Sequence, residues 1–160
     1  MLYEAFLNVY TKFKMHFYKE AFKKDSESGN ALTIVETFCM EAIHALGKPT
    51  VSQFARFMSF SSANAADKVN NLIHKGYLNK VRAEGDKRKY YLEVTPLYYE
   101  YYNKSYQYLK EIIKRVQYQF TDEELHTLTK LLTVLNQELL SDLEYECGAE
   151  GAQKQEAYGK

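Results

Sequence analysis

The feature that most constrains the fold is a charged turn between two runs of alternating residues. Within residues 78–84 the apolar Val81 and Ala83 alternate with the charged Lys80, Arg82 and Glu84, a glycine and an aspartate interrupt the alternation, and residues 90–95 resume it. A period of two is typical of a strand that buries one face, and a glycine beside an aspartate is typical of a tight turn. The sequence therefore predicts a two-stranded hairpin with one buried face, whose turn carries Lys87, Arg88 and Lys89.

Two short helices are predicted just upstream of this hairpin. Thr50 stands where the first helix begins and Gln53 follows three residues later, a spacing that lets the two side chains cap the helix start reciprocally. The second helix begins at Ser61 or Ser62 and runs to Gly76, because glycine tolerates the positive φ found just past a helix end. A helix-turn-helix followed by a basic hairpin is the element order of a winged helix.

The second short helix has an apolar inward side and a polar outward side. The outward side is expected to carry hydroxyl, amide and ammonium groups from Ser62, Asn64, Lys68, Asn71 and Lys75. Amide groups can read base edges, and ammonium groups can hold phosphates. We therefore expect this helix to be the recognition helix of a DNA-binding domain.

Charge is distributed unevenly along the chain. The formal net charge is zero, but residues 48–92 contain nine Lys or Arg and three acidic residues, a local net charge of +6. Residues 121–160 contain three Lys or Arg and nine acidic residues, a local net charge of −6. Since attraction to phosphate is screened beyond about 10 Å at moderate salt, the local charge matters more than the sum. The central segment is therefore predicted to be a basic patch.

Four short motifs in this region are specific. They are the helix opening PTVSQFA at residues 49–55, the helix exit LIHKGYL at 72–78, DKR at 86–88, and LEVT at 92–95. With them the chain resembles the MarR-type transcriptional regulators over roughly residues 1–146. The resemblance implies a mostly α fold with a small β-hairpin wing, in which a winged helix-turn-helix is joined to long dimerisation helices. One departure is Asp67, which stands in the middle of the recognition helix where the family often has a basic residue.

The residues expected to contact DNA lie at the two helix starts, along the second helix and on the hairpin. They are Thr50, Ser52, Ser61, Ser62, Asn64, Lys68, Asn71, Lys75, Arg82, Asp86, Lys87, Arg88 and Lys89. Asp86 either orients Arg88 for the minor groove or only caps the turn. Basic residues alone are ordinary for a solvated turn, and the preceding helix pair is what favours nucleic acid.

Apolar stripes predict long helices on both sides of the winged helix, at about residues 1–24 and 97–146. One chain of 160 residues has limited core for several such stripes, so burial against a second copy is expected. The resemblance implies the same homodimer. The predicted interface contains Phe6, Tyr10, Phe13, Ile112, Val116, Leu128, Leu132, Leu135 and Leu139.

A single MarR-like unit is thus expected over residues 1–146, with its DNA-binding part at about 31–95. A helix over residues 32–46 would connect the dimer base to the winged helix. The first of the carboxyl-terminal helices is expected to start after Pro96 and continue to Phe120. Residues 147–160 contain few apolar side chains and are expected to be disordered.

The predicted function is sequence-specific regulation of transcription. We expect a homodimeric repressor that binds a pseudo-palindromic operator in double-stranded DNA and is relieved by a small molecule. The resemblance implies a small aromatic or acyl effector, and the 15 tyrosines suit either core packing or such a pocket, whose residues are not assigned. The alternative is a winged-helix module for protein–protein interaction without DNA binding, which exposed apolar residues on the hairpin would favour.

Other classes of function have little support in the sequence. A glycine-rich phosphate loop and a nucleophile elbow are both missing, so neither an enzyme nor a cofactor is expected. The four histidines show no metal-ligand spacing, and Cys39 lies on an apolar helix face that favours burial over redox sensing. With two cysteines, no signal peptide and no apolar run that could span a bilayer, the protein is expected to be cytoplasmic and to make no membrane contact.

Overall fold

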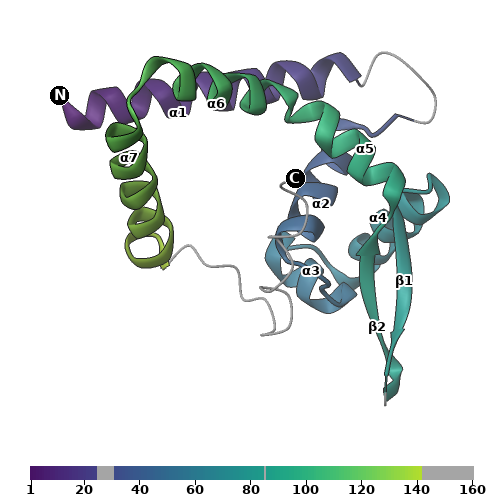
Figure 1. The fold of residues 1–160 in the computed structure, drawn as a ribbon. Coiled ribbons are helices and arrows are strands. Elements are labelled where there is room, and N and C mark those ends of the chain that lie inside the picture. The colour runs from purple at the N-terminus through teal and green to yellow at the C-terminus, as the bar shows by residue number, and fades with distance from the viewer. Residues whose placement is uncertain (25–30, 85, 142–160) are drawn as a thin grey trace. The chain divides into compact units, whose positions relative to one another are not determined.

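The computed structural model describes residues 1–24, 31–84 and 86–141 (Figure 1). The helices are α1 (Leu2–Lys24), α2 (Ile34–Ala45), α3 (Val51–Met58), α4 (Ser62–His74), α5 (Pro96–Ser105), α6 (Gln107–Gln119) and α7 (Asp122–Val134), which continues into the π-helical turn η1 (Leu135–Leu139). The strands β1 (Leu78–Ala83) and β2 (Asp86–Val94) pair antiparallel. The predicted class, mostly α with a small β-hairpin, is confirmed. The tail predicted at residues 147–160 lies outside the described residues.

The chain forms two compact units. The first comprises residues 1–99 and contains α1 to α4, the hairpin and the first residues of α5. The second lies within residues 100–146 and contains the rest of α5 together with α6, α7 and η1. The predicted division into a DNA-binding part and a dimerisation part stays a prediction.

Capping boxes set the starts of α2, α3 and α7. At α3 the Thr50 hydroxyl accepts the N–H of Gln53 at 3.2 Å, and Oε1 of Gln53 accepts the N–H of Thr50 at 2.8 Å. Such a cap contributes about 1 kcal/mol, because it pairs N–H groups that the first helical turn leaves without partners. The box predicted at Thr50 is confirmed.

The two short helices of the winged helix end in the same type of hydrogen-bonded turn. After α4 the N–H of Gly76 donates to the Ile73 carbonyl oxygen at 3.0 Å, and the N–H of Tyr77 donates to that of Leu72 at 3.1 Å. Gly76 has φ +83°, as its predicted role at the helix end requires. After α3 the equivalent position is Ser59 with φ 55°, a left-handed conformation that costs a non-glycine residue roughly 1 kcal/mol.

The hairpin is buried only at its base. Lys80 pairs with Leu92 across the strands, and the register shifts just beyond Arg82. Leu78 and Leu92 are fully buried, whereas Val81 is 41% exposed. The predicted hairpin is therefore confirmed, but its buried face is limited to the base. Val81 lies on the face opposite Leu78 because successive side chains alternate, and burial ends where the strands extend past the helices.

Backbone and hydroxyl hydrogen bonds tie the hairpin to the neighbouring helices. The N–H of Leu92 donates to the carbonyl oxygen of Pro49 at 2.8 Å, just before α3. The Thr95 hydroxyl donates to the carbonyl oxygen of Gly76 at 2.7 Å, just after α4. The start of one short helix and the end of the other are thus both anchored to β2 and its exit.

The core of the first unit is built by α2, α3, α4, the base of the hairpin and the start of α5. Its largest fully buried side chains include Tyr98, Phe54, Met40, Ile43 and Leu72. Fully burying one such aliphatic or aromatic side chain stabilises the fold by about 1.5–3 kcal/mol. This core holds the recognition helix in place from its inner side.

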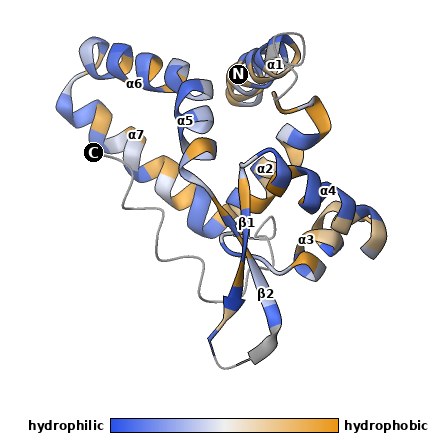
Figure 2. Cartoon of the chain, turned by 90° about the vertical axis from the view of Figure 1, so that its right-hand side faces the viewer, coloured by the Kyte–Doolittle hydropathy of each residue, from blue (hydrophilic) through white to orange (hydrophobic). Residues whose placement is uncertain are grey.

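In the second unit the long helix predicted after Pro96 is broken at Tyr106. The hydroxyl of Ser105 donates to the Tyr101 carbonyl oxygen at 2.9 Å, and the N–H of Leu109 donates to the Tyr106 carbonyl oxygen at 3.0 Å. The expectation of one continuous helix is corrected, since α5 ends at Ser105 and α6 begins at Gln107. Figure 2 shows hydrophobic residues recurring between hydrophilic ones along α6 and α7.

Candidate nucleic-acid interface

One face of α4 presents polar side chains to solvent. Ser62, Asn64 and Asn71 are exposed and Lys68 is half-buried, while the opposite side of the helix packs into the core. Each amide carries donors and an acceptor that can pair with base edges, and an ammonium group suits phosphate oxygen. The polar surface lies where the sequence places it, and its contact with DNA stays a prediction.

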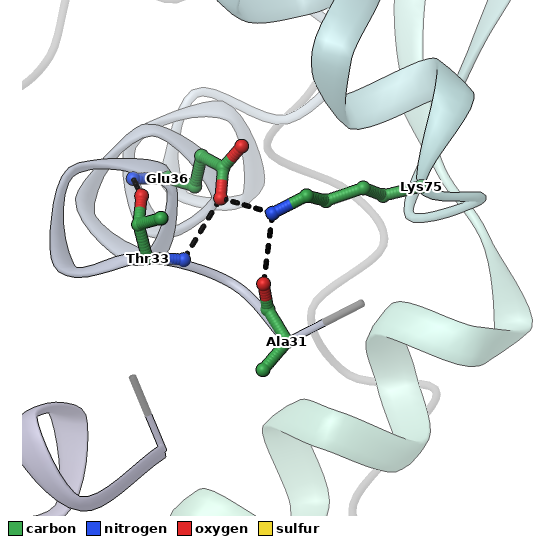
Figure 3. A network of polar contacts seen from close by, with 4 residues as sticks. All are labelled: Ala31, Thr33, Glu36 and Lys75. Carbon is green, nitrogen blue, oxygen red and sulfur yellow. Dashed lines mark hydrogen bonds and ion pairs between the residues drawn. The ribbon is translucent and has the colours of Figure 1, made fainter. Parts of the chain in front are cut away.

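Lys75 is not part of this surface. Its Nζ donates to Oε2 of Glu36 at 2.7 Å and to the carbonyl oxygen of Ala31 at 2.8 Å (Figure 3). Its side chain is only 19% exposed. The expectation that Lys75 lies on the outward side of the recognition helix is therefore corrected. Lys75 is the C-cap residue of α4, and its side chain extends to the start of α2, where its charge is paired.

Two of the hydroxyl groups predicted to contact DNA serve as helix caps. The Thr50 hydroxyl accepts from the N–H of Gln53 and also donates to its Oε1 at 3.1 Å. The Ser61 hydroxyl accepts from the N–H of Asn64 at 3.2 Å and is exposed. Ser52, in the first turn of α3, is exposed as well. The Thr50 hydroxyl already donates its hydrogen bond to Gln53, so the hydroxyls of Ser52 and Ser61 are better suited to donate a hydrogen bond to a phosphate.

The hairpin carries exposed basic side chains. Arg82 on β1 and Lys89 on β2 are both exposed, and Nζ of Lys89 lies 5.0 Å from the ring centre of Tyr91. A cation over an aromatic face is weakly attracted to it, which restrains the lysine without neutralising its charge. The remaining predicted contacts of the turn lie outside the described side chains: Asp86, Lys87 and Arg88.

Two basic residues that the sequence showed only as charge have specific partners. Nζ of Lys80 on β1 donates to Oδ1 of Asn70 on α4 at 3.5 Å, so it bridges the hairpin and the recognition helix. Lys48 forms an ion pair with Glu93 on β2, which reduces the positive charge of the basic patch. Lys80 could have been found from its spacing, because it occupies the same strand face as Arg82.

The apolar residues predicted to form a dimer interface remain accessible in the single chain. Phe6 and Tyr10 on α1 are 57% and 52% exposed, and Leu132 and Leu139 are 53% and 68% exposed. Among the described residues of α6, α7 and η1, none is buried. The remaining predicted interface residues are half-buried or exposed: Phe13, Ile112, Val116, Leu128 and Leu135. Accessible apolar stripes of this kind favour association, and the dimer itself stays a prediction.

Cys39 lies in the core of the first unit. Burial raises the pKa of the fully buried Cys39 thiol to about 11, against which a nearby Lys68 acts only weakly, so the reactive thiolate is disfavoured. No group of three His, Cys, Asp or Glu side chains in the described part of the chain is placed to hold a metal ion. None of the described helices combines the length and apolar character that crossing a bilayer requires.

Comparison with known proteins gives a family and a shared fold. Residues 32–90 match the MarR family. Curated proteins yield no significant match. Similar solved structures include FabT of Streptococcus pneumoniae in complex with DNA, with 23% identity, a TM-score of 0.59 and coverage of 90% of this chain and 100% of that chain. A transcriptional regulator of Thermotoga maritima has 18% identity and a TM-score of 0.62, with coverage of 85% of this chain and 97% of that chain. Wild-type apo MarR of E. coli has 16% identity and a TM-score of 0.50, with coverage of 84% of this chain and 96% of that chain.

At these identities the solved structures establish the shared fold. The family match covers α2, α3, α4, β1 and most of β2, which together are the winged helix. Through this winged helix, residues 32–90, the chain is similar to the MarR family.

Proposed function

We propose that the protein is a transcriptional regulator that binds double-stranded DNA in a sequence-specific manner. α4 enters a major groove with Asn64 and Asn71 towards the base edges, and the hairpin approaches the adjacent minor groove. One observation carries this proposal: the exposed polar face of α4 lies beside a hairpin with exposed Lys80, Arg82 and Lys89. Amides read bases and basic side chains hold phosphates, and here the two kinds of group occur together.

The proposed contacts are those predicted from the sequence, without Lys75 and with Lys80 added. They are Thr50, Ser52, Ser61, Ser62, Asn64, Lys68, Asn71, Lys80, Arg82, Asp86, Lys87, Arg88 and Lys89. FabT was solved in complex with DNA and shares this fold, which supports the proposal.

The regulator acts in this proposal as a homodimer. The accessible apolar stripes of α1 and α7 support association of two copies. A two-fold pair of winged helices presents two α4 helices to half-sites about one helical turn, roughly 34 Å, apart. A pseudo-palindromic operator matches that symmetry.

Repression with relief by a small aromatic or acyl effector completes the proposal. Its support is the resemblance to MarR-type regulators, together with the tyrosine content of the chain. An example within the first unit is the contact of His44 with the rings of Tyr98 and Tyr99, at centroid distances of 5.6 and 5.9 Å. Aromatic clusters pack well on aromatic and acyl groups. The proposal assigns no residue to the effector.

Selection of genomic fragments by the purified protein tests DNA binding. Bound fragments are sequenced, and their affinity is then measured by gel shift over a range of salt concentrations. Lys68→Ala combined with Arg82→Ala should weaken binding to every sequence and should lower the salt slope by about 0.9 for each lost phosphate contact. Lys110→Ala combined with Arg115→Ala removes the same number of positive charges from exposed positions on α6 and serves as the control. Fragments enriched no more than random DNA would contradict sequence-specific binding.

A second function, docking on a protein through the winged helix, is favoured by one observation. Val81 and Tyr90 on the hairpin are 41% and 43% exposed. Exposed apolar side chains suit a protein partner better than a phosphate backbone. If the hairpin docks on a protein, the selection enriches no DNA, and Val81→Ser with Tyr90→Ser abolishes capture of that partner. If the hairpin binds DNA, the same two changes alter DNA affinity far less than Arg82→Ala does.

A further inference from the structure

A partly buried ion pair joins the end of the recognition helix to the start of α2. Nζ of Lys75 lies 2.7 Å from Oε2 of Glu36, and the two side chains are only 19% and 8% exposed. The same ammonium group donates to the carbonyl oxygen of Ala31 at 2.8 Å. Figure 3 shows Lys75 reaching from the end of α4 to these two acceptors. The contact spans 39 residues of sequence.

The acceptor is held rigidly on the α2 side. Oε2 of Glu36 also accepts the N–H of Thr33 at 2.8 Å, and the Thr33 hydroxyl accepts the N–H of Glu36 at 3.2 Å. Burial by itself would raise the pKa of the Glu36 carboxyl, but the hydrogen bonds from Lys75 and Thr33 keep it below the ordinary value. Glu36 is therefore charged at neutral pH. A charge-assisted hydrogen bond to a fixed carboxylate defines a position more sharply than an apolar contact does.

The donor stands where both DNA-reading elements meet. Lys75 is the C-cap residue of α4, and β1 begins three residues later at Leu78. Between them, Gly76 accepts the hydrogen bond from the Thr95 hydroxyl at the exit of β2. The ion pair thus fixes one point from which α4 runs in one direction and the hairpin in the other.

We propose that Glu36 and Lys75 form a positioning pair, which sets the placement of α4 and the hairpin against α2 for sequence-specific DNA reading. The pair itself contacts no DNA. This inference rests on the proposed function, because the placement matters only if α4 and the hairpin read DNA together. Buried ion pairs are weak as sources of stability relative to apolar residues, whereas they can fix one arrangement among several.

Glu36→Gln separates this role from a simple effect of charge. Removing a negative charge from a DNA-binding domain strengthens its attraction to phosphate. Loss of a positioning contact does the opposite for the selected sequence, because α4 no longer meets its bases in register. The two explanations therefore predict opposite signs for one substitution.

The experiment uses the full-length protein and the DNA that it selects from a random library. Affinities for the selected DNA and for random DNA are measured at several salt concentrations with Glu36→Gln, Lys75→Met and Lys75→Arg, at a temperature where circular dichroism shows each variant folded. Glu84→Gln removes an acid at an exposed position and is the matched control. Amide hydrogen exchange of residues 72–77 is followed in the same variants without DNA.

We expect Glu36→Gln and Lys75→Met to weaken binding to the selected DNA on the order of tenfold, which is the range of coupling effects from residues outside a binding site. Binding to random DNA should change no more than it does in Glu84→Gln, and the salt slope should stay unchanged. Exchange at residues 72–77 should accelerate, and Lys75→Arg should restore the affinity. Tighter binding by Glu36→Gln, or a salt slope about 0.9 lower in Lys75→Met, would overturn the positioning role, because Lys75 would then be a phosphate contact.

Failure of the two proposals can be told apart. If the unmodified protein enriches no sequence from the library, the proposed function fails. Unchanged hydrogen exchange at residues 72–77 in Glu36→Gln and Lys75→Met overturns the positioning pair on its own, since that measurement needs no DNA. Glu36→Gln keeps the shape of the side chain, so the affinity and hydrogen-exchange measurements can still be made with this variant if Lys75→Met does not fold.

Discussion

The Thr95 hydroxyl donates a 2.7 Å hydrogen bond to the carbonyl oxygen of Gly76, and this bond joins the exit of the hairpin to the end of the recognition helix. Thr95 is buried, and its N–H also donates to the carbonyl oxygen of Tyr77 at 3.1 Å. A hydrogen bond of this kind contributes about 0.5–1.5 kcal/mol to stability. The threonine of the LEVT motif therefore has a structural task next to the proposed DNA-reading elements.

Thr95→Val should destabilise the protein. Valine keeps the shape of threonine but removes the hydroxyl that donates to the Gly76 carbonyl oxygen, at a cost of about 0.5–1.5 kcal/mol. The free energy of unfolding from urea titration followed by circular dichroism measures this loss. Thr95→Ser retains the hydroxyl and should cost clearly less. Equal stability of the valine and serine variants would show that the hydrogen bond contributes nothing.

Ser59→Gly should stabilise the protein. Ser59 has φ 55° at the end of α3, where glycine adopts the same conformation without steric strain. We expect a gain of about 0.5–1 kcal/mol, reduced somewhat by the greater freedom of glycine in the unfolded chain. Thermal unfolding of Ser59→Gly beside Ser59→Ala is the measurement. The alanine variant keeps the strained Cβ and should show no gain, so a gain in both would remove strain as the cause.

Local sequence rules predicted much of this fold. The capping partners of α3 and α7 are three residues apart, and α4 ends through bonds from Gly76 to the residue three positions earlier and from Tyr77 to the residue five positions earlier. Such features depend on neighbours in sequence, which a single chain displays directly. The break at Tyr106 is local too, but the Ser105 side-chain bond beside it gives no reliable signal, because Thr129 and Thr133 form the same kind of bond inside the unbroken α7.

The parts that failed depend on distant residues. Helical spacing assigns Lys75 to the outward side of α4, but its partner Glu36 lies on another helix, and a flexible lysine reaches it from the helix end. Alternation along β1 likewise says nothing about where the covering helices stop, so the exposure of Val81 was not predictable. At the candidate nucleic-acid interface, helical spacing predicted the polar face of α4. The contact between Lys80 and Asn70 was not predictable from the sequence, because it joins two different elements of the fold.

The stability of the first unit should fall as the pH falls below about 6.5. Burial lowers the pKa of His44 from its ordinary value of 6.5, so the unfolded chain takes up a proton at a higher pH than the folded chain does. The loss begins near 6.5 and levels off below the lowered pKa. The free energy of unfolding, measured by urea titration between about pH 8 and pH 5, follows this loss over the range where histidine titrates. His44→Phe keeps a ring against Tyr98 and should flatten this part of the profile, and an unchanged slope would assign it to another group.

Asn64→Ala and Asn71→Ala should change the sequence preference of DNA binding more than its strength on random DNA. Both side chains are exposed on α4, where an amide can form two hydrogen bonds with an adenine edge. We expect a loss of about 1–3 kcal/mol on the selected sequence, while binding to random DNA is set by the basic residues. Selection from a random library by each variant reports the preference. A residue whose loss weakens selected and random DNA equally makes no base contact.

Leu132→Asp should convert the protein from a dimer into a folded monomer. Leu132 is 53% exposed in the single chain, so aspartate is tolerated there by the fold, whereas in a dimer seam it would place a charge out of water at a cost of roughly several kcal/mol. Light scattering at micromolar concentration, together with circular dichroism, separates loss of the dimer from loss of the fold. Thr133→Asp puts the same charge on the next exposed position, outside the leucine stripe, and should remain dimeric. Binding to selected DNA should weaken with the dimer, since one winged helix makes about half of the phosphate contacts. If the unmodified protein is already a compact monomer, and if it binds its selected DNA no more tightly than Leu132→Asp does, both the dimer and the two-fold operator are contradicted.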